Sequence, residues 1–470
     1  MAARDRMTGW RWSCAGMISL ATACGDVPLL PLCRSPEFLS VAVVSIPGNV
    51  LGALVKVRLR DADSVSIRFV AAGASLPTET PAVPRGADST LVPVLGLSPE
   101  QDYGLTPVAY GDCGAALGPT QLWTTGALPE GVPQYATAGT NPADGYIAFG
   151  AGAYGLVIDN TGRVVWYHHF PNGPGLNFQA QPNGRYVARP PGTTPTDPAP
   201  WVELDPLGQI TRTFGCARGL TARFHDLIAA TDGSYWIMCD ETRTMDLSAL
   251  GGQPDARVTG TVVQHLSPAG TVLFEWSPFD HFALTDLDSA ARAGSNVNWT
   301  HGNAIDLDAE RNLLISFRSL NEITKIDTRT GAVVWRMGGR ANQFTFEGTE
   351  VPAFAAQHGL RLTGPSELIL LDNLGDPAGS RAERYTVDEA GRSVRLLATY
   401  GEGSGVIAQL GGTTQPLPNG HTLVAFGNGG RVEEYDAAGT PVWRIDGNAG
   451  YVFRAQRIWS LYQPGVGGPR

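Results

Sequence analysis

Charged residues are scarce in this chain, and basic ones are the scarcer kind. Lys and Arg number 34 against 44 Asp and Glu, which gives a formal net charge of -10 and a sequence pI near 5.3. Such a chain offers no extended basic surface for a nucleic-acid backbone, so we expect no nucleic-acid partner. Any small anionic ligand would need a local group of cations.

Long apolar runs are also missing at the N-terminus. The most apolar segment there, SCAGMISLATAC, follows three arginines and is too short to span a bilayer permanently. A basic start followed by a short apolar run is typical of an export signal. We therefore predict that residues 1–24 are a signal peptide.

The end of this segment resembles a bacterial lipoprotein cleavage site, in which small residues precede a cysteine that becomes lipidated. Here Leu-Ala-Thr-Ala precedes Cys24. Ala21 stands where leucine is commonest in such sites, so ordinary cleavage after Ala23 stays open. We expect a protein exported to the periplasm or the cell surface and anchored to a bacterial membrane by a lipid on Cys24.

Glycine and proline, by contrast, are abundant. The 58 glycines and 34 prolines follow no collagen period, and 43% of the 470 residues are hydrophobic. This composition is typical of folded domains that have many turns between short strands. It predicts an all-β protein with two domains.

One strand-turn-strand unit recurs six times along the chain. The copies read LVIDNTGRVVW, WVELDPLGQITRTF, VVQHLSPAGTVLFEW, ITKIDTRTGAVVW, ERYTVDEAGRSVRLL and VEEYDAAGTPVW. Their turn glycines are Gly162, Gly208, Gly270, Gly331, Gly391 and Gly439, with gaps of 46, 62, 61, 60 and 48 residues. Each copy predicts a β-hairpin whose tight turn needs a residue tolerant of positive φ. The period suits propeller blades with loops of varying length.

A second hairpin precedes most copies, for example LNFQAQPNGRYVAR and QHGLRLTGPSELILL. Two hairpins make one four-stranded blade, so we predict a six-bladed β-propeller over residues 145–470. The last apolar stretch, YVFRAQRIWSLYQ, has no partner hairpin of its own. We expect it to complete a blade begun by the GYIAFG strand, since closing the ring removes exposed edges.

The first domain is predicted to be a small immunoglobulin/fibronectin III-like β-sandwich over residues 25–128. Its segment LVPVLGLSPEQDYGLTPVAY has the pattern in which a tyrosine stands at the entry of a core strand. Residues 129–144 are polar and rich in glycine and proline, which is typical of a linker. A spacer, a dimerisation element and a lid over the propeller all stay open as roles for this domain, and so does a homodimer.

Four cysteines remain once the predicted signal segment is set aside, and none has a CxxC spacing. An even number in an exported chain predicts two disulfides. We favour Cys33 with Cys113, which would tie the ends of the first domain, and Cys216 with Cys239, which would brace one blade. Four cysteines permit three connectivities, and buried free thiols stay the alternative.

Three histidines open strand-like runs in the same phase of the repeat. They are His225 in FHDL, His301 in WTHGNAID and His358 in QHGLRL. Because the inner strands of a propeller surround one axis, we expect the three side chains to converge at one mouth of the channel. The remaining histidines do not share this phase: His168, His169, His265, His281 and His421.

Three imidazoles at one axis are compatible with a catalytic zinc site. Two further residues in the same motifs, Asn303 and Arg318, favour another reading. A guanidinium is repelled by a dication but stabilised beside an oxyanion. We therefore expect an anion pocket with a nucleophilic imidazole, and neither metal nor cofactor.

With these motifs in place, the chain resembles the bacterial arylsulfate sulfotransferases that work without a nucleotide donor. The likeness extends over nearly the whole length, from an exported N-terminus through a small sandwich to a six-bladed propeller. In that family a His-Gly-Asn motif, a later arginine, an earlier His-Asp and a later His-Gly form the site. Here these are His301 with Asn303, Arg318, His225 and His358. The distance along the sequence from Arg318 to His358 is shorter than in the best-known members.

The resemblance implies a ping-pong transfer of a sulfuryl group from a phenolic sulfate ester to a phenolic acceptor. His358 corresponds to the histidine that is transiently sulfonated. Arg318, Asn303 and one imidazole would hold the sulfuryl oxygens, while His225 or His301 would protonate the leaving phenolate. The absence of a GxxxxGK[ST] loop agrees with a donor that is not a nucleotide.

Two other classes of function stay open at this point. One is a propeller hydrolase or lyase that acts on an anionic ester with the same side chains. The other is a non-catalytic propeller that binds a protein or glycan on its face. Of the aromatic residues near the motifs, Phe224, Trp299 and Phe317, we expect packing between blades more than stacking on a phenol ring.

Overall fold

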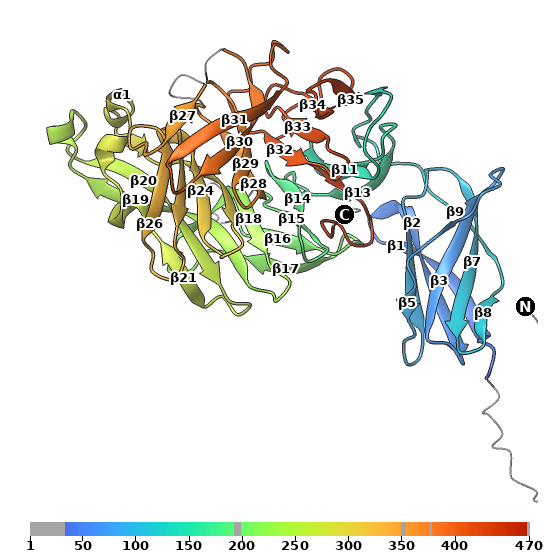
Figure 1. Cartoon of the computed structure of the whole chain (residues 1–470). Helices are drawn as coiled ribbons and strands as arrows, with labels where there is room; N and C mark the ends of the chain where they lie inside the picture. The colour runs from blue at the N-terminus through green and yellow to red at the C-terminus, as the bar shows by residue number, and fades with distance from the viewer. Residues whose placement is uncertain (1–32, 192–198, 349–353, 376–377, 468–470) are drawn as a thin grey trace, which may run out of the picture.

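The computed structural model describes residues 33–191, 199–348, 354–375 and 378–467 (Figure 1). The predicted signal peptide and Cys24 lie outside the described residues. Among the residues that are described, no helix has the length and apolar character needed to cross a membrane. The strands are divided between a small N-terminal pair of sheets and a larger group of six sheets.

The N-terminal strands form two sheets that share one core. The order is β1-β2-β6 in one sheet and β4-β3-β7-β8 in the other, where β5 and β9 also pair with β3 and β7. Their bounds are β1 Glu37–Ile46, β2 Asn49–Arg60, β3 Ser64–Ala71, β4 Thr78–Glu79, β5 Val83–Pro84, β6 Thr90–Leu95, β7 Asp102–Gly111, β8 Gly114–Leu117 and β9 Gln121–Thr124. Val55, Ile67, Val92 and Leu105 fill the space between the sheets. The arrangement is a β-sandwich, and its kinship with immunoglobulin or fibronectin III domains stays a prediction.

The larger part of the chain is a six-bladed propeller, which confirms the predicted all-β fold class. From inner to outer strand the first three blades are β36 Ala455–Ile458, β11 Tyr146–Ala151, β12 Tyr154–Ile158, β13 Val164–His169; β14 Phe178–Ala180, β15 Tyr186–Ala188, β16 Trp201–Leu204, β17 Ile210–Phe214; and β18 Thr221–Ala229, β19 Tyr235–Met245, β20 Ala256–Leu266, β21 Val272–Trp276. The other three are β23 Gly302–Leu307, β24 Leu313–Phe317, β25 Glu322–Ile326, β26 Val333–Gly338; β28 His358–Gly364, β29 Glu367–Asp372, β30 Arg381–Asp388, β31 Ser393–Tyr400; and β32 Thr413–Pro416, β33 Thr422–Ala425, β34 Val432–Tyr435, β35 Pro441–Ile445.

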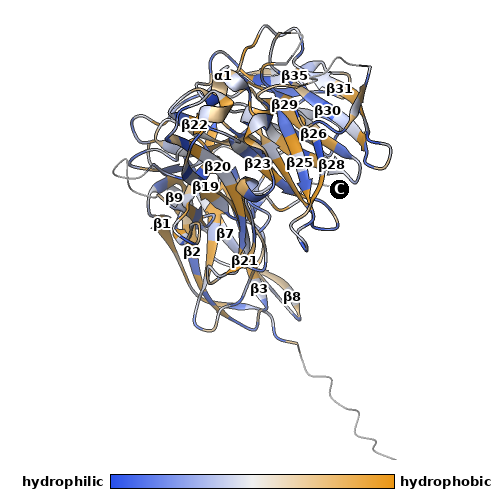
Figure 2. Cartoon of the chain, turned by 90° about the vertical axis from the view of Figure 1, so that its left-hand side faces the viewer, coloured by the Kyte–Doolittle hydropathy of each residue, from blue (hydrophilic) through white to orange (hydrophobic). Residues whose placement is uncertain are grey.

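Additional short elements decorate this ring. β10 Thr137–Gly139, β22 Asn296–Asn298 and β27 Thr345–Glu347 extend the sixth, third and fifth blades. The helices are η1 Ser248–Leu250, η2 Pro278–Asp280, η3 Leu284–Asp286, α1 Ser289–Arg292 and η4 Arg318–Leu320. Neighbouring inner strands contact one another, β18 with β23, β23 with β28, β28 with β32, β32 with β36 and β36 with β14. Hydrophobic segments lie along the strands of both parts of the chain (Figure 2).

The ring closes between the two ends of the propeller sequence. β36 pairs with β11 from Tyr146 opposite Ile458 to Phe149 opposite Ala455, as the unpartnered last stretch predicted. One part of the predicted linker differs from expectation. Residues 137–139 form β10, which pairs with the outer strand β35. Backbone pairing with an exposed edge requires no hydrophobic pattern, so the composition of residues 129–144 gave no sign of it.

The turn glycines behave as predicted in five of the six repeats. Gly162, Gly208, Gly270, Gly331 and Gly439 all have φ between +78° and +87°. In the fifth blade the expectation is wrong, because the left-handed residue is Arg392, with φ of +54°, and not Gly391. In that hairpin Asp388 itself pairs with Ser393, across four residues, whereas five residues separate the paired Ile158 and Val164 of the first blade.

Both favoured disulfides are present. Cys33 is bonded to Cys113 in the turn between β7 and β8, and Cys216 is bonded to Cys239 in β19. The first bridge fixes the start of the sandwich to its far end. The second fixes the segment that leads into β18 against the next strand of the same blade.

Candidate functional site

Three inner strands bring His225, His301 and His358 to one place. His225 lies in β18, His301 directly precedes β23 and His358 opens β28. One ring nitrogen of each residue lies within 4.8 Å of one nitrogen of each of the other two, and the Nε2 atoms of His225 and His301 are 3.2 Å apart. His301 adopts a left-handed backbone conformation with φ of +47°. Such conformations are rare outside glycine and cluster at functional sites.

Close approach of neighbouring blades explains why a glycine follows two of these histidines. A Cβ atom on Gly302 would lie 2.6 Å from Cε of Met238 and 2.7 Å from Cγ2 of Thr261. Gly359 has φ of +64°, and a Cβ atom there would lie 2.7 Å from Cα of Thr413. The His-Gly sequence is therefore required by the packing of the inner strands.

Arg223, which the sequence motifs did not identify, sets the proton positions on two of the rings. Its Nε lies 3.2 Å from Nδ1 of His225, and its Nη1 is paired with Asp240. A guanidinium N–H can only donate, so neutral His225 carries its proton on Nε2 and donates it to Nε2 of His301. His301 then carries its proton on Nδ1, which lies 2.6 Å from Nδ2 of Asn298. Both atoms are then donors, so this proton position requires the amide of Asn298 to be turned by 180°, with its oxygen toward the ring.

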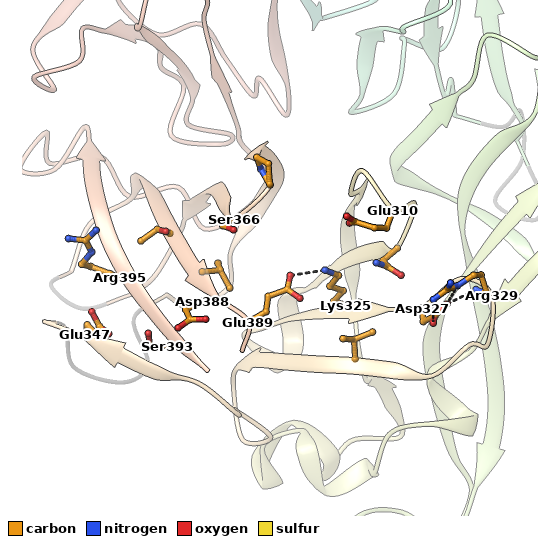
Figure 3. Close-up of a pocket in the computed structure, with 15 residues that line it drawn as sticks. Glu310, Lys325, Asp327, Arg329, Glu347, Ser366, Asp388, Glu389, Ser393 and Arg395 are labelled. Atoms are coloured by element: carbon orange, nitrogen blue, oxygen red, sulfur yellow. Dashed lines mark hydrogen bonds and ion pairs between the residues drawn. The ribbon is translucent and has the colours of Figure 1, made fainter. Parts of the chain in front are cut away.

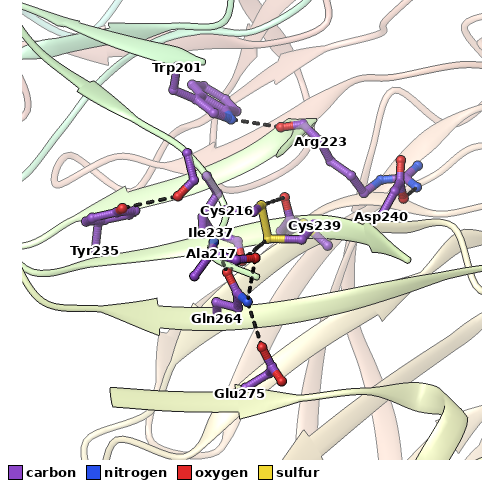
Figure 4. The surroundings of a disulfide bond; sticks show 12 residues. Trp201, Cys216, Ala217, Arg223, Tyr235, Ile237, Cys239, Asp240, Gln264 and Glu275 are labelled. Atoms are coloured by element: carbon purple, nitrogen blue, oxygen red, sulfur yellow. Dashed lines mark hydrogen bonds and ion pairs between the residues drawn. A yellow bond between two sulfur atoms is a disulfide. The ribbon is translucent and has the colours of Figure 1, made fainter. Parts of the chain in front are cut away.

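The second disulfide supports this arginine. Asp240 follows Cys239 in β19, and the bond to Cys216 holds that strand beside β18 (Figure 4). On the other side, Nε1 of Trp201 donates a 2.7 Å hydrogen bond to the carbonyl of Arg223. Both the backbone and the guanidinium of Arg223 are therefore held in place.

His358 is oriented by two oxygen atoms. Nδ1 lies 3.0 Å from the carbonyl oxygen of Ala356 and 2.9 Å from Oδ1 of Asn373. A carbonyl oxygen can only accept, so Nδ1 carries the proton. The lone pair is therefore on Nε2, where it accepts a 3.3 Å hydrogen bond from the N–H of Gly411.

All three histidines are neutral near pH 7. Burial lowers the pKa of His358 to about 4, with Arg318 acting in the same direction and the hydrogen bond to Asn373 opposing it. Burial, followed by the charge of Arg223, lowers the pKa of His225 well below its usual value and that of His301 to about 2. Neutral imidazoles offer lone pairs and N–H donors, but no positive charge.

Arg318 adds a second positive charge at this end of the channel, beside the ion-paired Arg223. Its Nη2 donates a 3.1 Å hydrogen bond to the carbonyl of Gln409, and its Nε has no partner within the described part of the chain. No carboxylate of those residues forms an ion pair with it, although burial lowers the pKa of the guanidinium. A partly buried cation without a counterion is stabilised by a bound anion.

Asn303 lies close by in β23 and is almost fully buried. Its Nδ2 donates a 2.6 Å hydrogen bond to the carbonyl of Gln357, the residue before His358. One N–H of the amide remains for a second acceptor, and Oδ1 has no partner among the described residues. The structure thus brings all five predicted residues to neighbouring positions on three blades.

Asp226, the acidic residue that directly follows His225, has a structural role. It is fully buried and accepts hydrogen bonds from Arg361 at 3.0 Å, Arg454 at 3.1 Å and the N–H of Ile305 at 3.2 Å. These partners belong to β28, to the residue before β36 and to β23. Asp226 therefore joins its own blade to three others and positions the strand that carries His225.

Two phenylalanines flank the histidines. The ring of Phe224 stacks on His225 at 4.1 Å between centroids, and Phe453 lies edge-on to His225 at 5.8 Å and to His358 at 6.3 Å. Trp299 and Phe317 are buried in the core of the third and fourth blades, as expected. Phe453 was not identified from sequence because it lies in the connection before β36, outside every repeated hairpin.

The N-terminal sandwich contacts the propeller elsewhere. Leu95 donates from its N–H to Oη of Tyr462, and Arg163 donates to the carbonyl of Gly96, each at 3.2 Å. Tyr462 follows the end of β36, whereas Phe453, beside the histidines, precedes its start. The length of an inner strand therefore separates the sandwich from the histidines, which argues against a lid.

The three imidazoles could offer one nitrogen each to a metal ion. The surrounding charges fit such an ion poorly, because Arg223 and Arg318 both act on the rings electrostatically. The Nε2 proton of His225 is also directed at His301. An anion with several oxygen acceptors suits these donors better than a dication does.

A cavity of about 950 Å³ lies elsewhere, at the periphery of the fourth and fifth blades (Figure 3). Its charged lining residues are Glu310, Asp327, Glu347, Asp388 and Glu389 against Lys325, Arg329 and Arg395. Lys325 is paired with Asp308 and Glu389, and Arg329 with Asp327. This surplus of carboxylates repels an anionic ester, so we do not place the site there.

A comparison with known protein families matches the part of the chain that contains the three histidines. Residues 217–448 match the family described as "Arylsulfotransferase (ASST)". This segment contains all five predicted site residues. None of the curated proteins matches the chain.

Solved structures resemble the chain only distantly. A protein of unknown function from Bacteroides caccae has a TM-score of 0.44 and 11% identity, and the match covers 67% of this chain and 98% of that one. A streptogramin B lyase has a TM-score of 0.39 and 14% identity, covering 68% and 85%. Virginiamycin B lyase from Staphylococcus aureus has a TM-score of 0.33 and 13% identity, covering 70% and 90%.

Proposed function

Because the chain belongs, over residues 217–448, to the arylsulfotransferase family, we propose that it transfers a sulfuryl group from a phenolic sulfate ester to a phenolic acceptor through a sulfonated histidine. The observation that carries the proposal is the position of Arg318. This cation lacks a carboxylate partner among the described residues and acts on all three neutral histidines. A sulfate monoester supplies one negative charge and oxygen acceptors for the donors around it.

The donor binds with its sulfuryl oxygens toward Arg318 and the free N–H of Asn303. Both groups are rigidly held, Arg318 by Gln409 and Asn303 by the carbonyl of Gln357. Donors fixed before the substrate arrives need no reorganisation when charge develops in the transition state. The phenyl ring then lies against Phe224 and Phe453, which flank the imidazoles.

In the first half-reaction the Nε2 lone pair of His358 leaves its hydrogen bond with the N–H of Gly411 and attacks sulfur. An N–S bond forms, the S–O bond to the phenol breaks, and the phenolate leaves with the electron pair of that bond and takes up a proton from water. The Nε2–H of His225, which donates to His301 in the absence of donor, turns to the charge that develops on the leaving oxygen. The hydrogen bond from Arg223 to Nδ1 of His225 keeps the proton on Nε2.

In the second half-reaction an acceptor phenol enters in place of the first. Its proton passes through the paired imidazoles of His225 and His301 to water, its oxygen attacks sulfur, and the N–S electron pair returns to Nε2 of His358. The proton given up by the acceptor balances the one taken up by the leaving phenolate. No oxidant, nucleotide or metal enters this balance.

We also propose that the protein is exported and acts outside the cytoplasm, lipid-anchored through Cys24. The two disulfides support an oxidising compartment.

The first prediction tests the reaction. Purified protein should release 4-nitrophenol from 4-nitrophenyl sulfate, and added phenol should accelerate the release and appear as phenyl sulfate. The activity should be the same with and without a chelator, and no nucleotide should be needed. Release that phenol does not accelerate would support a hydrolase, and loss of activity with the chelator would support a metal site.

The second prediction concerns pH. Because burial lowers the pKa of His358 to about 4, its ring is neutral at pH 6 and above, and a protonated ring cannot attack sulfur. The rate of sulfonation by donor alone should stay constant between about pH 6 and pH 8 and fall as the pH approaches 4. Circular dichroism at each pH is the control, since buried neutral histidines destabilise the fold when they must be protonated. An acid limb centred near pH 6.5 would contradict the assignment of a buried neutral nucleophile.

A further inference from the structure

The orientation of the Asn373 side chain is fixed by its own hydrogen bonds. Nδ2 donates to the carbonyl oxygens of Ala408 at 2.7 Å and Gly411 at 2.9 Å. Both partners can only accept, so the nitrogen of the amide must face them and the oxygen must face His358. Asn373 is fully buried, and Ser380 donates to its backbone carbonyl at 2.8 Å.

A second oxygen faces the same imidazole nitrogen. The carbonyl of Ala356 lies 3.0 Å from Nδ1 of His358, and Ala356 has a left-handed φ of +51°. Its N–H is held by Oδ1 of Asn321 at 2.8 Å. Two acceptors at one ring nitrogen leave the proton no alternative position, since moving it to Nε2 would place a lone pair against two oxygens.

We propose that Asn373 is a positioning residue that keeps the proton on Nδ1 of His358 through both halves of the sulfuryl transfer. The inference rests on the proposed function and concerns the charge state of the intermediate. When Nε2 bonds to sulfur, the ring becomes an imidazolium that retains its Nδ1–H. The oxygens of Asn373 and Ala356 accept a hydrogen bond from the positively charged ring, which strengthens as the charge develops.

The amide is suited to this role because it accepts a hydrogen bond but does not remove the proton. An N-sulfoimidazolium releases a neutral imidazole when the acceptor attacks sulfur. A ring that has lost its Nδ1 proton would have to leave as an imidazolide anion, which is a much poorer leaving group. Asn373 therefore favours formation of the adduct and also keeps it reactive toward the second phenol.

Two substitutions at position 373 separate this role from a structural one. Asn373→Leu removes the acceptor, and we expect sulfonation by donor alone to slow by about tenfold or more. Asn373→Asp supplies a basic acceptor, so sulfonation should persist while transfer to phenol slows by at least a similar factor. The adduct should then accumulate during turnover, as measured by intact mass.

A merely structural role predicts a different pattern. Neither leucine nor a carboxylate can donate to Ala408 and Gly411, so loss of packing would slow both half-reactions alike in both variants. Ser380→Ala is the matched control, because it removes bonds to the same segment without touching the imidazole. It should leave the ratio of the two half-reaction rates unchanged. Equal loss of both rates in Asn373→Asp would overturn the proposal.

A measurement on the unsubstituted protein covers the case in which these variants do not fold. Nitrogen-15 NMR of histidine-labelled protein should show His358 with a protonated Nδ1 and an unprotonated Nε2 at pH 7. An Nε2–H tautomer would overturn the inference, whatever the activity. If the tautomer is as expected but the donor adds no sulfuryl group, the proposed function fails and the proton-holding geometry around His358 stands.

Discussion

His358→Ala should abolish sulfuryl transfer, lowering turnover of an aryl sulfate by about four orders of magnitude or more. The variant removes the lone pair that would form the N–S bond. Incubation of the unsubstituted protein with donor alone should add one sulfuryl group, with a matching burst of phenol. Mass spectrometry should place the group on the peptide that contains QHGLRL, and the variant should show neither adduct nor burst.

The matched control is His281→Ala. His281 is exposed, follows η2 and stacks on Trp276 at the surface of the third blade. Its loss should leave the burst intact. An adduct on His225 or His301 would preserve the family assignment and change the roles of the histidines. Full turnover with no adduct would indicate direct transfer between donor and acceptor bound together.

Arg318→Met should lower the rate of sulfonation by about a hundredfold or more while leaving the nucleophile in place. Methionine keeps much of the length of the side chain but removes the cation that acts on the sulfuryl oxygens. The sulfonation rate of Arg318→Lys should lie between those of the unsubstituted protein and Arg318→Met, since an ammonium keeps the charge but loses the planar fork of donors. Single-turnover kinetics with excess protein would separate this effect from weaker donor binding.

Arg340→Met is the comparison for that experiment. Arg340 is exposed and forms a surface ion pair with Asp288, which contributes little to stability. Its loss should leave single-turnover kinetics unchanged. If Arg318→Met were sulfonated at an unaltered rate, Arg318 would not bind the sulfuryl group and the proposed function would lose its main support.

The sequence was most informative where a repeat fixes a position. Equivalent starts of inner strands must surround one axis, so His225, His301 and His358 could be expected to meet from their shared phase alone. The same reasoning predicted that the last strand would pair with β11. Arg223 could have been found in the same way, because residues two apart in a strand lie on the same face and Arg223 precedes His225 by two.

Other parts of the site depend on geometry that the repeat does not encode. Asn373 reaches His358 from beyond the end of β29, across a pairing with an irregular register between His358 and Arg361. Phe453 comes from a connection with no repeated pattern. The left-handed residue Arg392 shows that even a repeated turn can move its left-handed position by one residue when the strand pairing beside the turn differs.

Because β36 pairs with β11, the closed ring of blades depends on the last described strand of the chain. A chain that stopped before residue 455 would contain every one of the five site residues, yet its first blade would lack the inner strand that seals the ring. Joining segments so distant in sequence is entropically costly and slow, so closure should come late in folding. We therefore expect chains truncated before β36 not to assemble a functional histidine cluster.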